Sequence, residues 1–286
     1  MYRCLLVAFC LVFSIQSFAN VKADQAALAY AERDYDDAGV KKAQEAEALY
    51  GEAVLAEAVE LAKLNLMLDQ ASANYFLGTA LSKKSERKAA HQKAMDLADS
   101  ILTSLGVAPD KAHELTQDQA NALLNKLDAD QELVVAEAMY SKGISLAQWG
   151  KLNGISSSIG KLPTVLGLME RIEMLGYESI HQYGPYRTIG RVNFVLPKIF
   201  KGDIAKSEKF LKDAYSKSLA EGQKYSINGY NNIYLAETMY KLGKETGAKK
   251  LLDTFLAADI GTLAEGSEPE NREAMRVAQN LADDWK

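Results

Sequence analysis

Two arginines four residues apart are the residues in this sequence whose spacing most suggests chemistry. Arg187 and Arg191 lie in the stretch Tyr-Arg-Thr-Ile-Gly-Arg, and a four-residue step places both side chains on one face of a helix. Like charges on one face repel, so each guanidinium needs a carboxylate partner or an anionic ligand. The sequence leaves two interpretations open: salt bridges to another helix, or a point that binds a carboxylate ligand or a partner.

Four aromatic residues could line a pocket or groove beside the arginine pair. Aromatic side chains are common in the lining of binding pockets. At helical spacing, however, they more often belong to a hydrophobic core, so the sequence leaves both roles open. The candidate ligand- or partner-binding residues are therefore Arg187, Arg191, Tyr186, Tyr183, Trp149 and Tyr140.

An incomplete calcium-loop pattern occurs early in the chain. Four of its positions are matched, but an alanine stands where the loop needs a fifth-position ligand, and a lysine stands where an apolar residue is usual. We therefore predict a solvated turn between two helices. The matching residues are Asp34, Asp36, Gly39 and Glu45, and the mismatched ones are Ala38 and Lys41.

A glycine- and serine-rich stretch at 154–161 resembles a phosphate-binding loop. It has one residue too many between its glycines, and Leu162 replaces the hydroxyl that would bind magnesium. No apolar strand precedes it, whereas a phosphate loop follows a strand. We therefore reject a nucleotide site and predict an irregular loop over residues 150–160.

The histidines and carboxylates do not form a recognisable catalytic or metal site in the sequence. His91, His113 and His181 are never three or four residues apart on one helix, so none share a local metal-binding face. We expect each at the surface or within a helical hairpin. The carboxylates are interspersed with lysines along amphipathic helices, which is typical of solvated faces. We predict a protein that is not an enzyme and has no catalytic residues, metal or cofactor.

The composition favours helices and argues against nucleic acid as a partner. The chain has 286 residues, of which 48% are hydrophobic and 25% charged, and only 5 are proline. Ala, Leu, Lys and Glu dominate, and these residues favour helix. The net charge of −5 at pH 7 argues against phosphate binding, which needs a basic surface.

The N-terminal segment 1–19 has the features of a secretory signal peptide. Arg3 precedes an apolar run that is too short to span a bilayer, and small residues flank the expected cleavage after Ala19. Both cysteines, Cys4 and Cys10, fall in this segment, so the mature chain would have no thiol. Because Phe9 is bulky where a lipid-attachment motif needs a small residue, we expect no lipid anchor. We predict a secreted, periplasmic protein whose residues 20–286 form a single helical domain.

Repeated helical hairpins are the main feature of the mature chain. A pair of small residues twelve apart recurs, Gly78 with Ala90 and Ala236 with Ala248, where two helices of a tetratricopeptide hairpin would cross closely. A hairpin cannot bury its apolar face alone, so repeated hairpins imply stacking. We predict an all-α fold of tetratricopeptide-like hairpins stacked into a compact solenoid or bundle.

Further helix boundaries follow from capping signals. Gly202 and Asp203 predict a tight corner before a helix that Asp203 caps. Thr116 and Gln119 have the spacing of a capping box and predict a helix to about residue 127. Ser267 and Glu270 have the same spacing and predict a final helix to Trp285. Two more helices are expected over residues 129–149 and 162–175.

An ordered series of motifs resembles the T-component proteins of TRAP transporters, the tripartite ATP-independent periplasmic solute uptake systems. The series covers roughly Ala71 to Leu281, and its most specific part pairs Gly-Pro-x-Arg with Gly-Asp. We expect structural roles for Gly184, Pro185, Gly190, Gly202 and Asp203. In order, the motifs are residues 73–78 (Ala-Asn-Tyr-Phe-Leu-Gly), 149–151 (Trp-Gly-Lys), 162–163 (Leu-Pro), 169–171 (Met-Glu-Arg), 184–187 (Gly-Pro-Tyr-Arg), Gly190, Pro197 and 202–203 (Gly-Asp).

This resemblance implies a non-enzymatic periplasmic accessory protein. Members of the family associate with the solute-binding protein of the transporter and form trimers with a hydrophobic-lined pore in each protomer. We therefore expect the solute-binding protein of a TRAP transporter as the partner, a small anionic or amphipathic ligand as a further candidate, and a homo-oligomer. The alternative is a general cell-envelope scaffold, since tetratricopeptide surfaces bind helices or extended peptides.

Overall fold

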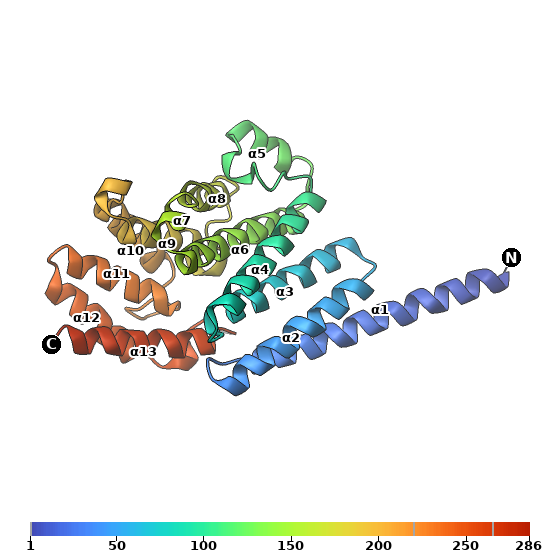
Figure 1. The fold of residues 1–286 in the computed structure, drawn as a ribbon, viewed down its shortest axis with the longest axis horizontal. Helices are drawn as coiled ribbons and strands as arrows, with labels where there is room; N and C mark the ends of the chain where they lie inside the picture. The colour runs from blue at the N-terminus through green and yellow to red at the C-terminus, as the bar shows by residue number, and fades with distance from the viewer. Residues whose placement is uncertain (1, 220, 265) are drawn as a thin grey trace. The chain divides into compact units, whose positions relative to one another are not determined.

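Helices make up almost all of the regular secondary structure of this protein (Figure 1). The computed structural model describes residues 2–219, 221–264 and 266–286, with side chains described from residue 16 onwards except at 155 and 156. Within these ranges the backbone forms no strand, only an isolated antiparallel bridge between Leu219 and Ser226. The predicted all-α fold class is confirmed. The chain divides into two compact units, Met1–Lys161 and Leu162–Lys286.

The N-terminal unit is a row of helices in which consecutive helices pack against each other. Helix α1 packs on α2, α2 on α3 and α3 on α4, while α6 packs on both α3 and α4. The predicted turn before residue 39 separates α1 from α2. The elements are α1 (Tyr2–Ala31), α2 (Asp37–Ala56), α3 (Glu60–Ala80), α4 (Lys84–Ser104), η1 (Ala112–Glu114), α5 (Gln117–Leu124), α6 (Ala129–Asn153) and α7 (Ile155–Ile159).

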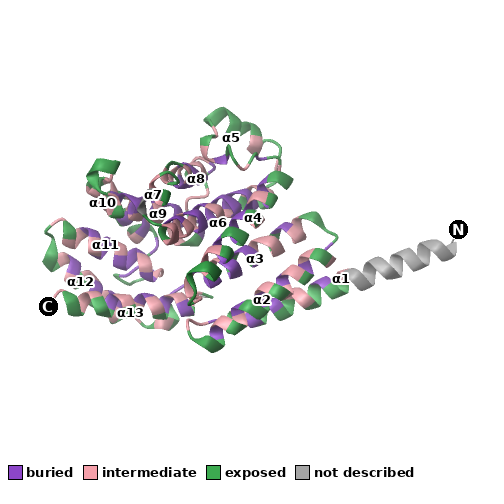
Figure 2. Ribbon diagram, viewed as in Figure 1, coloured by how far each residue is buried: buried purple, intermediate pink, exposed green. Residues whose placement is uncertain are grey.

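Small residues dominate the contacts among α1, α2 and α3. One cluster joins Ala26, Ala46 and Ala73, all fully buried, around Tyr50. A second cluster packs Phe76 and Leu77 of α3 against α2 and α4. Alanine lets helix axes approach closely because it carries only one methyl group, and it also favours helix. Along α2, α3, α4 and α6 the buried side shows as purple, with green exposed residues on the other side (Figure 2).

The C-terminal unit consists of a second series of hairpins. Helix α9 packs on α8 and α10, and α11 packs on α9, α10, α12 and α13. Its core contains Ile233, Leu252 and Phe255, all fully buried, with the small residues Ala236 and Ala274 between them. The elements are α8 (Leu162–Met174), α9 (Ile180–Val195), η2 (Lys198–Phe200), α10 (Ile204–Lys217), α11 (Gly229–Lys241), α12 (Glu245–Leu256), η3 (Ile260–Thr262) and α13 (Glu268–Asp284).

Most of the capping signals act as expected. The carboxylate of Asp203 accepts hydrogen bonds from two backbone N–H groups at the start of α10, and Thr116 forms a reciprocal capping box with Gln119. The predicted capping box at Ser267 is wrong, because the Ser267 side chain makes no cap hydrogen bond. Pro269 nevertheless stands in the first turn of α13. Proline is tolerated there because N–H groups of the first turn make no hydrogen bond within the helix.

The expected irregular loop over residues 150–160 is also wrong. Helix α6 continues to Asn153, Gly154 breaks it with a φ of 95°, and the short helix α7 follows. A Cβ added to Gly150 would lie 3.3 Å from Cα of Ser158, so α7 folds back closely onto the end of α6. Glycine therefore serves both a left-handed turn and a close helix contact in this stretch.

Several N-terminal predictions stay predictions. The proposed signal peptide lies largely outside the residues whose side chains are described. Among the described residues, no helix is both long enough and apolar enough to cross a bilayer. The single domain predicted for residues 20–286 also stays a prediction, since the chain forms two compact units that are described separately.

His91 occupies the crossing point of α3 and α4, in the hairpin where the small pair Gly78 and Ala90 was predicted. Of the two positions expected for this histidine, surface or helical hairpin, it takes the hairpin position, and its side chain is fully buried. Its ring rests on Gly78, where an added Cβ would lie 2.4 Å from Cε1 of His91. Burial, followed by the nearby charge of Arg87, lowers the pKa of His91 from 6.5 to about 4. The imidazole is therefore neutral near pH 7.

We predict that His91 makes the fold sensitive to mild acid. Because the pKa of His91 is lower in the folded protein, its imidazole binds a proton more tightly in the unfolded chain. The free energy of unfolding therefore decreases as the pH is lowered. The loss begins below pH 6.5, is complete near pH 4 and amounts to about 3 kcal/mol. The free energy of unfolding is measured by urea denaturation for the wild type and for His91→Leu across this pH range. We expect the wild-type value to fall by that amount relative to the value of His91→Leu as the pH is lowered. A difference that does not change with pH would contradict this prediction, and His91→Gln provides a second variant.

Two of the expected structural glycines permit close backbone contacts. At Gly202, an added Cβ would lie 1.9 Å from the carbonyl oxygen of Leu196, so only glycine fits the corner before α10. At Gly190, the added Cβ would lie 2.5 Å from Cγ of Leu211, where α9 crosses α10. Leu211 is fully buried. Gly190 therefore lets a leucine of the next helix pack directly onto the backbone of α9.

We expect Gly190→Ala to destabilise the C-terminal unit. The new methyl group would overlap Leu211, including an approach of 3.3 Å to its backbone nitrogen, so α9 and α10 would have to separate. The free energy of unfolding should fall by about 1–3 kcal/mol. Gly160→Ala is the matched control, since a Cβ there meets nothing within 4 Å and the residue has a helical backbone. Equal stability of the two variants in urea denaturation would show that the contact is unimportant.

Candidate functional site

Three consecutive left-handed residues precede the regular part of α9. His181, Gln182 and Tyr183 have φ values of 48°, 53° and 60°, although none is glycine. Such backbone conformations are costly for residues with a Cβ and persist only when their surroundings hold them. The regular helix begins with the buried residues Gly184 and Pro185, where proline fits because the first helical turn needs no N–H donor.

Arg187 binds the backbone of this left-handed turn. Its Nη1 donates to the carbonyl oxygens of His181 and Gln182, at 3.2 Å and 3.4 Å. The same nitrogen donates to Oδ1 of Asn231 at 3.1 Å, and Nδ2 of Asn231 donates in turn to the Gln182 carbonyl at 3.0 Å. A guanidinium can hold several oxygens at once because its donors are fixed in a plane. Arg187 thus connects the turn to α11.

Arg191 forms a salt bridge between helices. Its Nη1 lies 2.6 Å from a carboxylate oxygen of Glu237 on α11, and both side chains are largely shielded from solvent. The guanidinium also lies over the rings of Tyr234 and Phe194, with 4.3 Å and 4.9 Å to the ring centroids. These contacts fit the first of the two interpretations of the arginine pair, a structural link between helices.

Tyr186 anchors an aromatic group between α8, α9 and α10. Its hydroxyl donates to Oε1 of Glu173 at 2.9 Å, and its ring packs edge-on against Phe210, 5.5 Å between centroids. Burial, followed by this hydrogen bond, raises the pKa of Tyr186. Tyr183 stacks beside it at 6.0 Å, and the ammonium of Lys217 lies over both rings. The buried ring of Tyr186 is therefore part of the core.

The other two aromatic candidates belong to the N-terminal unit. Tyr140 is buried on α6, and Trp149 lies two turns further along the same helix, where its carbonyl accepts a hydrogen bond from Asn153. Tyr183 and Tyr186 belong instead to the C-terminal unit. A pocket that combines these residues with Tyr183 and Tyr186 stays a prediction.

A buried polar cluster that the sequence analysis did not identify surrounds Asn231. Besides the Gln182 carbonyl, its amide donates to Oγ of Ser218 at 2.9 Å and Oγ of Ser226 at 3.2 Å. The neighbouring Asn232 accepts a hydrogen bond from the Ser226 backbone and donates one to its carbonyl. Both asparagines are fully buried. Two adjacent asparagines at the start of an apolar helix were the available signal, because buried amides need several partners.

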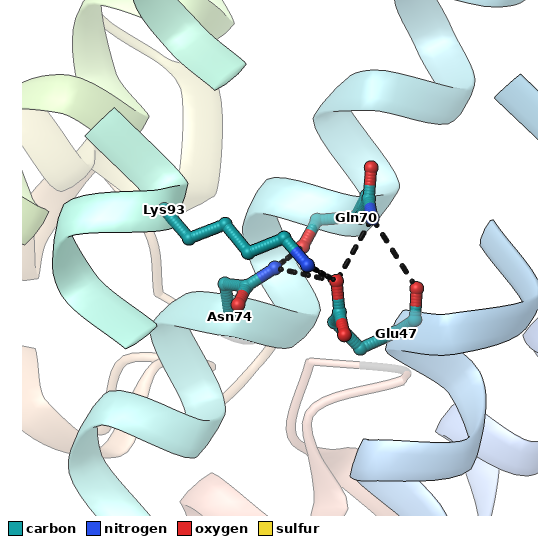
Figure 3. A network of polar contacts seen from close by, with 4 residues as sticks. All are labelled: Glu47, Gln70, Asn74 and Lys93. Carbon is teal, nitrogen blue, oxygen red and sulfur yellow. Dashed lines mark hydrogen bonds and ion pairs between the residues drawn. The ribbon is translucent and has the colours of Figure 1, made fainter. Parts of the chain in front are cut away.

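A second polar cluster joins α2, α3 and α4 around Glu47. Figure 3 shows Gln70, Asn74 and Lys93 converging on its carboxylate. The Glu47 oxygen Oε1 accepts from Gln70 Nε2 at 2.8 Å and Asn74 Nδ2 at 3.3 Å, and Lys93 completes the group as an ion pair. Burial alone would raise the pKa of Glu47, but the hydrogen bonds from Lys93 and Gln70 outweigh it and lower the pKa. The acid therefore remains ionised and linked to three helices.

The described residues contain no cluster suited to a metal. Among them, no group of three or more histidine, cysteine, aspartate or glutamate side chains could hold an ion. In the calcium-loop pattern, Asp36 instead caps α2 by accepting from the Gly39 N–H at 2.7 Å, and Asp34 accepts from the Tyr35 N–H at 2.8 Å. The predicted turn between two helices is present there.

We classify this protein by its fold, because comparison with known proteins identified no family. No known protein-family profile matches the chain, and no curated protein matches it. The structure defines an all-α protein built from packed helical hairpins, with its polar clusters at the junctions between helices. The arginine and tyrosine candidates of the C-terminal unit lie together on α9.

We expect Arg191→Met to lower stability because it leaves the Glu237 carboxylate shielded from solvent without its cation. The free energy of unfolding should fall by about 2 kcal/mol, the typical value for a hydrogen bond to a charged group. Arg276→Met is the matched control, since Arg276 pairs with Glu273 on an exposed surface of one helix and should contribute little. Replacing both Arg191 and Glu237 with Met should restore most of the loss. Unchanged thermal stability of Arg191→Met would favour a ligand-binding role.

Proposed function

We propose that this protein is a non-enzymatic helical-hairpin protein that acts outside the cytoplasm as an accessory component of a TRAP-type solute uptake system. Its role is to bind the solute-binding protein of that system. The signal-peptide features and the ordered motifs support the location and the partner. Helical hairpins stacked side by side support the mode of action, because such arrays present extended surfaces to other proteins.

The observation that best supports partner binding is the exposed apolar surface of the first hairpin. Leu55 is 87% exposed, Leu28 69% and Val59 56%. These exposed fractions are large for aliphatic side chains, and Leu55 and Val59 lie four residues apart where α2 ends and α3 begins. Neighbouring exposed apolar side chains are typical of protein-binding surfaces. The outward-facing residues of α1 and α2 are coloured green in Figure 2. The proposed docking surface is therefore defined by Leu55 and Val59, while Leu28 is a separate exposed leucine nearer the turn between α1 and α2.

The charge around this docking surface specifies the kind of partner surface that fits it. Between Asp24 and Glu60 the sequence contains ten acidic and three basic residues. An apolar contact with a negative rim is complemented by an apolar patch with a basic rim, which also speeds association. We therefore expect the solute-binding protein to contact α1 and α2 through a basic surface, in a salt-dependent interaction.

The proposal does not depend on a ligand at the arginine pair. Arg191 is neutralised by Glu237, and Arg187 holds the backbone turn at residues 181–182. A small anionic or amphipathic ligand, a homotrimer and a pore remain parts of the proposal that the family resemblance alone supports. Native mass spectrometry of the purified protein would detect both a bound small molecule and a trimer.

Affinity capture tests the proposed function. Immobilised full-length protein is exposed to an extract of the extracytoplasmic compartment, and captured proteins are identified by mass spectrometry. We expect the solute-binding component of a TRAP transporter, and Leu55→Asp should weaken its binding at least roughly tenfold if this leucine lies at the centre of the contact. Leu133→Asp is the matched control, a partly exposed leucine on α6 outside the acidic hairpin.

The possible results of this capture are distinct. A folded bait that recovers no solute-binding protein would refute the proposed transport role. Recovery of envelope-assembly proteins would support the alternative of a general scaffold. Capture of the solute-binding protein with equal affinity by Leu55→Asp and the wild type would retain the function and reject the docking surface.

A further inference from the structure

The connection between α9 and α10 carries exposed apolar side chains, which form an apolar tip. The tip consists of Val195, Ile199 and Phe200, with exposed fractions of 55%, 83% and 42%. Ile199 and Phe200 are adjacent in the short helix η2. An aliphatic and an aromatic side chain in water at the same turn are unfavourable unless something else covers them.

Hydrogen bonds hold this turn in a fixed shape. The N–H groups of Phe200 and Gly202 both donate to the carbonyl of Pro197, at 2.9 Å and 3.2 Å, and the Lys201 N–H donates to the carbonyl of Lys198. Gly202 packs directly against the carbonyl of Leu196, which closes the turn. The apolar side chains are therefore presented to solvent by an ordered backbone, and binding would require little further ordering.

The tip stands in a basic part of an acidic protein. Lys198 and Lys201 flank Ile199 and Phe200 directly in the sequence. From Val195 to Lys217 there are six lysines and three acidic residues, whereas the whole chain has a net charge of −5. Two of the three acids are occupied within the protein, Asp203 as the cap of α10 and Glu208 in an ion pair with Lys244. A complementary surface must therefore be apolar at its centre and anionic around it.

We propose that the apolar tip docks on the surface of an anionic lipid bilayer. Ile199 and Phe200 enter the interfacial region, while Lys198 and Lys201 bind the lipid phosphates. Interfacial binding combines buried apolar area with attraction to anionic lipids, and a small basic apolar protrusion supplies both. This proposal is independent of the proposed partner protein.

A fluorescent probe at the tip tests this proposal within the full chain. In a Cys4→Ser/Cys10→Ser background, Ile199→Cys is labelled with bimane and mixed with vesicles of phosphatidylcholine and phosphatidylglycerol, 3:1, that carry a spin-labelled lipid. We expect a blue shift and strong quenching, and little of either with pure phosphatidylcholine. The probe reports its own position, so the apolar N-terminal segment cannot produce the signal by anchoring the chain elsewhere. Leu133→Cys with the same label is the control and should stay unquenched.

Charge variants test the lysines. Lys198→Gln with Lys201→Asn, which keeps a residue suited to the left-handed backbone at 201, should raise the anionic-lipid concentration needed for half-maximal quenching roughly tenfold. Lys250→Gln on α12 is the control and should change nothing. An unquenched probe at residue 199, or equal quenching at residue 133, would overturn the proposal. A blue shift that rises with protein concentration without lipid would also overturn it, by assigning the tip to a protein contact.

Discussion

The structure depends on the close approach of paired helices, because each amphipathic hairpin can bury its apolar face only against a neighbour. Helix axes separated by about 8–10 Å leave room for large side chains only where the facing residue is small. Gly78 accommodates the ring of His91 between α3 and α4, and Gly190 accommodates Leu211 between α9 and α10. In both places the helix backbone itself forms part of the core. Residues without bulk therefore mark the places where these paired helices approach most closely.

Because the helices pack this closely, the polar side chains at their junctions determine which helices can pack against each other. Glu47 and Asn231 are shielded where three segments meet, and each has its oxygen or amide partners supplied by other helices. Burying such groups without partners would cost about 1–3 kcal/mol each, so a wrongly docked hairpin is penalised even when its apolar contacts are good. The apolar faces therefore supply affinity between helices, while the polar clusters select the correct neighbour. Neither cluster needs a ligand to be complete.

Local signals predicted the helices well, whereas contacts between distant segments were largely hidden. Asp203 and Thr116 cap their helices as expected because a cap bonds only the next three residues. Ser267 has the same spacing but does not cap α13, so the pattern alone was insufficient. Residues 150–160 were predicted as a loop from their glycines and serines, yet α7 packs back on α6 through Gly150. The sequence left His91 between a surface and a hairpin position for the same reason: the space over Gly78 that buries its ring exists only after the hairpin closes.

The arginine pair shows how far spacing determines a residue's role. Four-residue spacing predicted that both charges need partners, and Arg191 has one in Glu237, 46 residues away. Arg187 takes a different kind of partner, the carbonyl oxygens of a left-handed turn that no local residue preference would produce. Arg187 and Asn231 bind the carbonyls of the turn, and these oxygens in turn solvate the partly shielded guanidinium charge. The strained backbone and the guanidinium thus stabilise each other where α9 packs on α11.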